Sequence, residues 1–146
     1  HVLTHPGHAD AELLDKLMSK NKLTGGCLCG AVRYEVDGEA TDAWYCHCES
    51  CRRATGAPVT AWTMVAAQEL AWPVGPRARH ESSTGVYRGY CRDCGTPLSY
   101  ETVYQGETVI CVLTATLDDP DASPPTRHVF HDERIAWFGT GDQLPR

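Results

Sequence analysis

Seven of the eight cysteines stand in short clusters with the spacing of metal sites. The clusters are GGCLCG, YCHCESC and YCRDCGTP, and Cys111 lies apart from them. Thiolates two or three residues apart can wrap around one metal ion, and zinc takes four such ligands in tetrahedral geometry. The spacing therefore favours metal binding. Four disulfides that use all eight cysteines are the alternative, but a CxC or CxxC pair closed on itself is strained.

Two of the clusters together predict a closed, structural zinc site. Cys27 and Cys29 form one pair, and Cys91 and Cys94 form a CxxC knuckle. Gly95 follows the knuckle and supplies the permissive backbone that such a turn needs. Four thiolates complete a tetrahedral shell, so this site would join the first strand region to a hairpin some sixty residues later.

The third cluster, with Cys46, Cys48 and Cys51, is one ligand short of a closed zinc site. Zinc held by three protein ligands keeps a fourth position for water or substrate, so this site predicts catalysis, with a thiol as a suitable substrate. A fourth ligand from His47, Cys111 or a distant histidine would instead close it. His47 should point away from its two neighbouring cysteines, and Cys111 lies in an apolar β run. An iron–sulfur cluster or metal-free thiols are further alternatives.

Short β-type runs must position these cysteines. Glycine, proline, aspartate and serine separate them, which predicts a mainly β sandwich or partly closed barrel. A Pro-rich loop is expected over residues 118–128, where PDAS suits a single turn. Leucines at helical spacing predict a short N-terminal helix, so we divide the chain into an arm of residues 1–22 and a domain of residues 23–146. The runs cover residues 31–36, 43–45, 59–65, 86–90, 97–103, 108–114 and 135–138.

Composition limits the partners. With 146 residues, 42% of them hydrophobic, the chain has the size of one domain. A net charge of -6 provides no field that attracts nucleic acid or anionic membranes. The sequence has neither an apolar run long enough to cross a bilayer nor a signal-peptide pattern. We therefore expect a soluble cytoplasmic protein with a small-molecule thiol or aldehyde as its partner.

Three ordered motifs carry a resemblance to a known family. GGCLCGAVRYEV, CHCESCRRATGAP and STGVYRGYCRDCGTPLSY, followed by HVFHDERIAWF with Trp137, resemble the glutathione-dependent formaldehyde-activating family, also called the CENP-V/GFA family. The resemblance implies an Mss4-like β-tent of short antiparallel sheets with two zinc ions. It also implies the same division of the cysteines. Cys27, Cys29, Cys91 and Cys94 match the structural ligands, and Cys46, Cys48 and Cys51 match the catalytic ones.

The resemblance also implies a reaction, in which glutathione adds to formaldehyde to give S-hydroxymethylglutathione. The chain would then be a zinc-dependent carbon–sulfur lyase with glutathione as possible cosubstrate. Arg52 and Arg53 would pair with the glutathione carboxylates, and Ser83, Thr84 and Arg88 would bind substrate or order a loop. The first alternative is a non-catalytic, zinc-stabilised binding module. The second is a redox enzyme similar to methionine sulfoxide reductases that reacts through Cys111, although burial would make this thiol unreactive.

Overall fold

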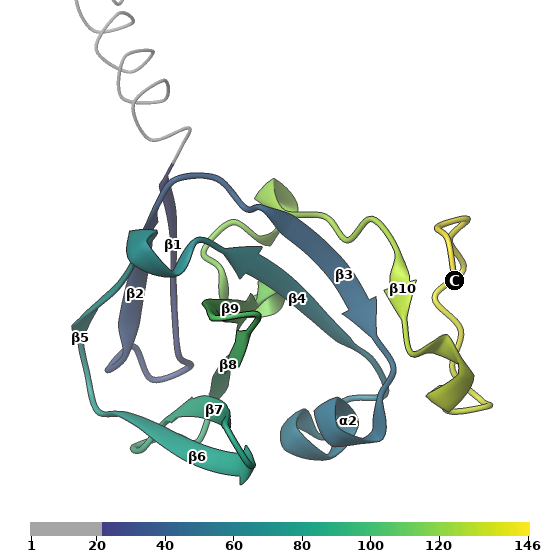
Figure 1. Cartoon of the computed structure of the whole chain (residues 1–146), viewed down its shortest axis with the longest axis horizontal. Helices are drawn as coiled ribbons and strands as arrows, with labels where there is room; N and C mark the ends of the chain where they lie inside the picture. The colour runs from purple at the N-terminus through teal and green to yellow at the C-terminus, as the bar shows by residue number, and fades with distance from the viewer. Residues whose placement is uncertain (1–21) are drawn as a thin grey trace, which may run out of the picture.

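A computed structural model of the protein describes residues 22–146, and the predicted N-terminal helix lies outside this range. Ten strands in two sheets form the framework of the described chain (Figure 1). The smaller sheet is antiparallel and has three strands, in the order β1 (Lys22–Gly26), β2 (Arg33–Asp37) and β5 (Leu70–Val74). Within residues 22–146, no helix has the length and apolar character that crossing a membrane requires.

The larger sheet has seven strands and carries the residues of interest. Its neighbouring strands are antiparallel, except that the two-residue strand β10 runs parallel to β3. The mainly β fold expected from the sequence is therefore confirmed. In spatial order the strands are β10 (His128–Val129), β3 (Asp42–Cys46), β4 (Thr60–Val65), β9 (Glu107–Leu113), β8 (Pro97–Tyr104), β7 (Val86–Cys91) and β6 (Arg77–Ser83).

Strand β9 shows how the larger sheet serves two cores. Ile110 and Val112 belong to a core that includes residues of the smaller sheet, whereas Cys111 and Leu113 belong to a second core on the other face. Successive side chains of a strand point to opposite faces, so one apolar run can fill both cores. The second core contains Cys46 and Cys51, and it is the face on which the candidate site lies.

One short helix was not predicted. Helix α2 (Glu49–Thr55) contains only seven residues, too few to display a helical period in the sequence. The Cys48 thiol takes the place of the usual serine or aspartate cap, since its sulfur accepts from the backbone N–H of Cys51 at 3.3 Å. Cysteine is not among the common N-cap residues, so the sequence does not indicate that a helix begins after Cys48. The single turn predicted at PDAS is confirmed by the 3₁₀ helix η3 (Pro120–Ala122).

The strand predicted over residues 135–138 is wrong, because these residues form turns and irregular structure. Phe130 has a φ of 52° and precedes the 3₁₀ helix η4 (His131–Glu133), so the chain turns away from the sheet directly after β10. A β-type composition forms a strand only where a partner strand is available. Trp137 is accordingly 77% exposed.

Candidate metal centres and the adjoining pocket

The first cysteine group joins the two sheets. Cys27 and Cys29 follow β1 of the smaller sheet, Cys91 ends β7 of the larger one, and Cys94 lies in the turn toward β8. All four sulfur atoms lie within 4.8 Å of one another. The sulfur atoms of Cys27 and Cys29 are 3.5 Å apart, and those of Cys29 and Cys91 are 3.8 Å apart. Zinc–sulfur bonds of about 2.3 Å give a tetrahedral edge of about 3.8 Å, so this group fits zinc.

Hydrogen bonds hold the sulfur atoms of this group in place. The backbone N–H of Val32 donates to the Cys27 sulfur at 3.2 Å. The Thr96 hydroxyl accepts from the Leu28 N–H at 3.1 Å and lies 3.1 Å from the Cys94 sulfur, so it connects the two cysteine pairs. Hydrogen bonds from Thr96 are the main reason why the pKa of Cys94 falls to about 5. This favours the thiolate form that metal binding requires.

Two glycines allow the close turns around this group. Gly95 has a φ of 78° and donates its N–H to the Cys91 carbonyl at 2.8 Å, which confirms its predicted role in the knuckle. Gly25 lies just before the first pair. A Cβ atom there would come within 2.3 Å of the Tyr34 hydroxyl and 2.5 Å of the Thr116 carbonyl. Only glycine lets β1 approach these neighbours so closely.

The second group lies where β3 meets α2. Cys46 is the last residue of β3, Cys48 caps the helix, and Cys51 lies in its first turn. Their three sulfur atoms lie within 4.8 Å of one another, and no fourth cysteine, histidine or carboxylate of residues 22–146 belongs to the group. The spacing also fits zinc, with three thiolates on one side of the ion. None of the eight cysteines is in a disulfide.

His47 points away from this group, as the sequence predicted. Its Nε2 lies 2.7 Å from Nδ1 of His128, and Nε2 of His128 lies 3.0 Å from a carboxylate oxygen of Asp142. A carboxylate only accepts, so Nε2 of His128 donates to Asp142, and the hydrogen bond between His47 and His128 contains one proton between Nε2 and Nδ1. Burial, followed by the nearby His128, lowers the pKa of His47. His47 thus connects the segment of residues 46–51 to the C-terminal segment.

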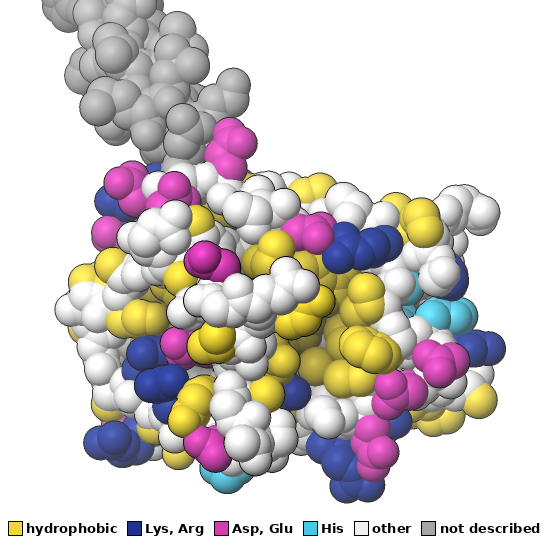
Figure 2. All heavy atoms as spheres, viewed as in Figure 1, with side chains coloured by type: hydrophobic (Ala, Val, Ile, Leu, Met, Phe, Trp, Pro, Cys, Tyr) yellow, Lys and Arg dark blue, Asp and Glu magenta, His cyan; other side chains and the backbone are white. Residues whose placement is uncertain are grey.

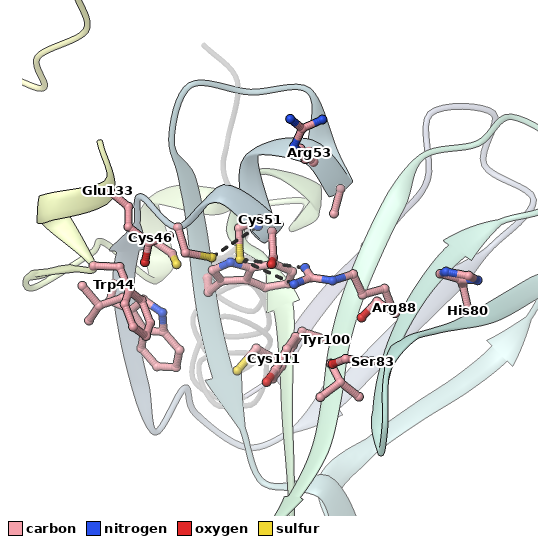
Figure 3. Close-up of a pocket in the computed structure, with 18 residues that line it drawn as sticks. Trp44, Cys46, Cys51, Arg53, His80, Ser83, Arg88, Tyr100, Cys111 and Glu133 are labelled. Carbon is pink, nitrogen blue, oxygen red and sulfur yellow. Dashed lines mark hydrogen bonds between the residues drawn. The ribbon is translucent and has the colours of Figure 1, made fainter. Parts of the chain in front are cut away.

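Arg88 approaches the second group from the opposite side. Its two terminal nitrogens lie 3.8 and 3.9 Å from the Cys51 sulfur (Figure 3). A hydrogen bond from the Cys46 thiol, with smaller contributions that include Arg88, lowers the pKa of Cys51 to about 5. Cys111 is only 2% exposed, and burial raises its pKa to about 12. This supports the sequence argument against a reactive Cys111.

Cross-strand pairing explains how residues far apart in the sequence reach one site. His80 of β6 lies opposite Arg88 of β7, Arg88 opposite Tyr100 of β8, Tyr100 opposite Cys111 of β9, and Cys111 opposite Met64 of β4. Directly opposed residues share a face of the sheet. This row therefore crosses five strands on the face that carries the second cysteine group.

A cavity of about 740 Å³ covers this face and contains the three thiols in its wall. In Figure 2 hydrophobic side chains gather in a hollow over β3 and β4, with charged side chains around it. Arg53 lines the cavity and forms an ion pair with Glu49 at 2.9 Å. Arg52 does not line it. Ser83 and Arg88 do, but Thr84 does not.

Several further lining residues were missed in the sequence. Among them are Trp44, Trp62, Phe130 and Glu133. Trp44 lies two residues before Cys46 on the same strand, so strand periodicity assigns it to the same face and was the available signal. The other three come from segments that only folding brings near the cysteines. Figure 3 shows Trp44 and Glu133 near Cys46, with His80 and Ser83 on the far side of Arg88.

A family model, a curated relative and a solved structure are similar to this chain. Residues 22–133 match the family model described as glutathione-dependent formaldehyde-activating enzyme. An uncharacterized lyase of Schizosaccharomyces pombe is 29% identical over 76 residues, which cover 52% of this chain and 55% of that protein. The match thus spans about half of the curated relative's length. The crystal structure of a Rhodobacter sphaeroides protein is similar with a TM-score of 0.53 and 28% identity, over 65% of this chain and 87% of that one.

Proposed function

Because the chain belongs to the family of glutathione-dependent formaldehyde-activating enzymes, we propose that it is a zinc-dependent carbon–sulfur lyase. It interconverts a hemithioacetal with its component thiol and aldehyde. The observation that carries this proposal is the three-thiol group in the wall of a large cavity, with no fourth ligand from residues 22–146. A site with three protein ligands leaves a coordination position for substrate.

In this proposal both cysteine groups hold zinc. Cys27, Cys29, Cys91 and Cys94 form the structural site, and Cys46, Cys48 and Cys51 form the catalytic one. Zinc at the catalytic site would act as a Lewis acid that favours the thiolate form of a substrate thiol. The described residues then have to bind the substrate, stabilise negative charge on sulfur and accept or return one proton.

The reaction moves one proton and one electron pair. In the lyase direction the hydroxyl group of the hemithioacetal loses its proton, its oxygen becomes the aldehyde carbonyl, and the carbon–sulfur bond electrons leave with sulfur as a thiolate. Glu133 and His80 line the cavity and can exchange this proton. Arg88 stabilises the negative charge at the sulfur atoms, since its guanidinium already contacts Cys51.

S-Hydroxymethylglutathione is the first substrate to test, because the family is named for this chemistry. Arg53 and Arg88 in the cavity wall suit the carboxylates of glutathione. Arg52 lies outside the wall, and its Nε is buried without a hydrogen-bond partner in residues 22–146, so we assign it to packing. We place this activity in the cytoplasm, because a reducing compartment keeps the eight cysteines free.

A non-catalytic binding module remains the competing function. The cavity favours the enzyme, because a module that uses zinc only for stability has no need of a three-ligand metal group in a pocket wall. The cavity also offers a proton acceptor in Glu133 and a cation in Arg88, as hemithioacetal chemistry requires.

Exchange spectroscopy by NMR tests the lyase directly. Zinc-loaded protein should increase the rate at which glutathione and S-hydroxymethylglutathione interconvert in the presence of formaldehyde, relative to the spontaneous reaction. Cys48→Ser should lose about one zinc per chain and most of this increase while keeping its circular-dichroism spectrum. Equal exchange rates with and without the zinc-loaded protein would exclude the named activity.

A further inference from the structure

The cavity wall beside Cys46 is aromatic. Trp44 lies two residues before Cys46 on β3, and it is directly opposite Trp62 on β4. Both tryptophans therefore share the face that carries the Cys46 thiol. Val129 of β10 pairs with Cys46 on the other side and extends the same apolar surface. Trp62 is only 4% exposed, so a group bound next to this thiol would contact the Trp44 ring, Val129 and the small exposed part of Trp62.

The opposite wall is polar and cationic. Arg88 and His80 lie on β7 and β6, and Ser83 ends β6 (Figure 3). Within residues 22–146, Arg88 forms no salt bridge with a carboxylate. Its guanidinium contacts the Cys51 sulfur and the Tyr100 ring, and no carboxylate of the described residues neutralises its charge. The cavity thus has an aromatic side, which also carries Glu133, and a cationic side, with the three thiols between them.

Phe130 gives an independent sign that the aromatic side binds a ligand. Its backbone has a φ of 52° and a ψ of 39°, a left-handed conformation that is unfavourable for an aromatic residue. Its side chain lines the cavity but is 59% exposed. Burial in a core therefore does not account for this conformation. Strained residues of this kind cluster at ligand sites, where the strain positions a side chain.

The size of the cavity argues against formaldehyde as the aldehyde that best fills it. A cavity of about 740 Å³ holds roughly 25 water molecules at about 30 Å³ each. Formaldehyde has two non-hydrogen atoms and no apolar group to cover indole rings. A glutathione moiety whose carboxylates reach Arg88 and His80 would leave the exposed surface of Trp44 and Phe130 uncovered.

We propose that the preferred substrate is a hemithioacetal whose aldehyde half carries an aromatic ring, which binds between Trp44, Trp62 and Phe130. The anionic thiol half then binds toward Arg88 and His80. This inference rests on the proposed lyase function for the position of the reacting sulfur. It extends that function to an aromatic aldehyde, with the same bond broken and the same proton transferred.

Stable thioethers test the binding preference without turnover. S-Benzylglutathione and S-methylglutathione share the thiol half and differ by one phenyl ring. Isothermal titration of the zinc-loaded protein should give a dissociation constant at least tenfold lower for the benzyl compound, because its ring buries apolar surface against the tryptophans. Equal constants, or no binding of either compound, would overturn the proposal.

Variants of the cavity wall test where the aromatic ring binds. Phe130→Ala should reduce the ratio of the two dissociation constants at least threefold, and Trp44→Leu provides a second probe of the same wall. Tyr104→Ala is the matched control, because Tyr104 is also an exposed aromatic residue but lies outside the cavity wall. An unchanged ratio in both wall variants would contradict the assigned position of the ring.

Turnover separates this inference from the proposed function. The glutathione adduct of benzaldehyde, of which S-benzylglutathione is the stable analogue, should have a higher kcat/KM than S-hydroxymethylglutathione. Cleavage of both adducts at equal efficiency, with equal binding of the two thioethers, would leave the lyase standing and overturn the aromatic preference. Selective binding of the benzyl compound without cleavage of any adduct would reject the lyase and support the aromatic subsite.

Discussion

At the scale of single residues, the side chain that distinguishes the second cysteine group from an ordinary metal knuckle is Arg88. Both of its terminal nitrogens approach the Cys51 sulfur, and its guanidinium lies 5.3 Å from the centre of the Tyr100 ring. A planar guanidinium can contact a sulfur and an aromatic face together, which an ammonium group on a lysine does less well. Arg88 therefore combines charge with a fixed direction toward the Cys51 sulfur.

Arg88→Met should lower kcat/KM for S-hydroxymethylglutathione by roughly 10- to 150-fold, because a hydrogen bond to a charged group contributes about 1.5–3 kcal/mol. Steady-state rates at several glutathione concentrations measure this loss, and zinc content shows whether the metal site is retained. Arg79→Met is the matched control, since Arg79 pairs with Glu101 and does not line the cavity. Equal losses in the two variants would remove Arg88 from the reaction.

At the scale of elements, a chain of side chains joins β3 and β10 to the C-terminal segment. His47 follows β3, His128 begins β10, and Asp142 lies near the chain end, which runs beside β10 in Figure 1. The His128 ring is also stacked on Tyr45, with their centroids 4.9 Å apart. The segment of residues 46–51 is thus held in place through His47, on the side away from the three thiols.

Asp142→Ala should destabilise the protein, because it leaves the Nε2–H of His128 with only the more distant Thr140 hydroxyl, at 3.4 Å, as an acceptor. The His128 side chain is fully buried, and an unsatisfied buried donor costs about 1–3 kcal/mol. Chemical denaturation measures the change in the free energy of unfolding. Asp132→Ala, which removes an exposed carboxylate near the same segment, is the control.

The difference in the free energy of unfolding between wild type and Asp142→Ala should depend on pH. A hydrogen bond with Thr140, followed by His128, lowers the pKa of Asp142 below its ordinary value of 3.8. A carboxyl group whose pKa is lower in the folded state stabilises the protein above that ordinary value and loses the effect as pH falls below it. The gap between wild type and Asp142→Ala should therefore be constant near neutral pH and shrink in acid. A gap that grows in acid would contradict this account.

At the scale of the whole molecule, the four-thiol group connects the two sheets. Cys27 and Cys29 extend from β1 of the smaller sheet, and Cys91 ends β7 of the larger one, so one ion would tie both sheets at this end. A structural zinc can contribute on the order of 10 kcal/mol to folding, which equals the whole net stability of a typical domain. The two metal groups should therefore differ in their effect on folding.

Cys91→Ser should abolish the cooperative thermal unfolding transition, whereas Cys48→Ser should lower the midpoint only modestly. Far-UV circular dichroism follows the transition, and elemental analysis should find close to two zinc ions in wild type and one in Cys48→Ser. A Cys91→Ser protein that melts at the wild-type temperature would refute the structural role. A wild-type protein with iron instead of zinc would favour the cluster alternative.

The sequence alone determined the two cysteine groups, the mainly β class and the family. Ligand spacing is local, since a CxxC pair followed by Gly95 forms a knuckle wherever the chain carries it. The orientation of His47 also follows from the sequence. Side chains alternate along an extended chain, so His47 and its two neighbouring cysteines cannot all face the same ion. Its errors, such as the strand over residues 135–138 and the missing helix α2, lie where short segments depend on their neighbours.

Only the tertiary structure decided what surrounds the second group. Arg88, Tyr100 and Cys111 meet because three strands pair in one register, and a shift by a single residue would turn each strand's side chains to the other face. Phe130 reaches the cavity because its backbone is left-handed, a conformation that the local sequence does not predict. Candidate metal ligands are therefore readable from spacing within the chain. The cavity beside them depends on pairing between strands, which the order of residues along the chain does not show.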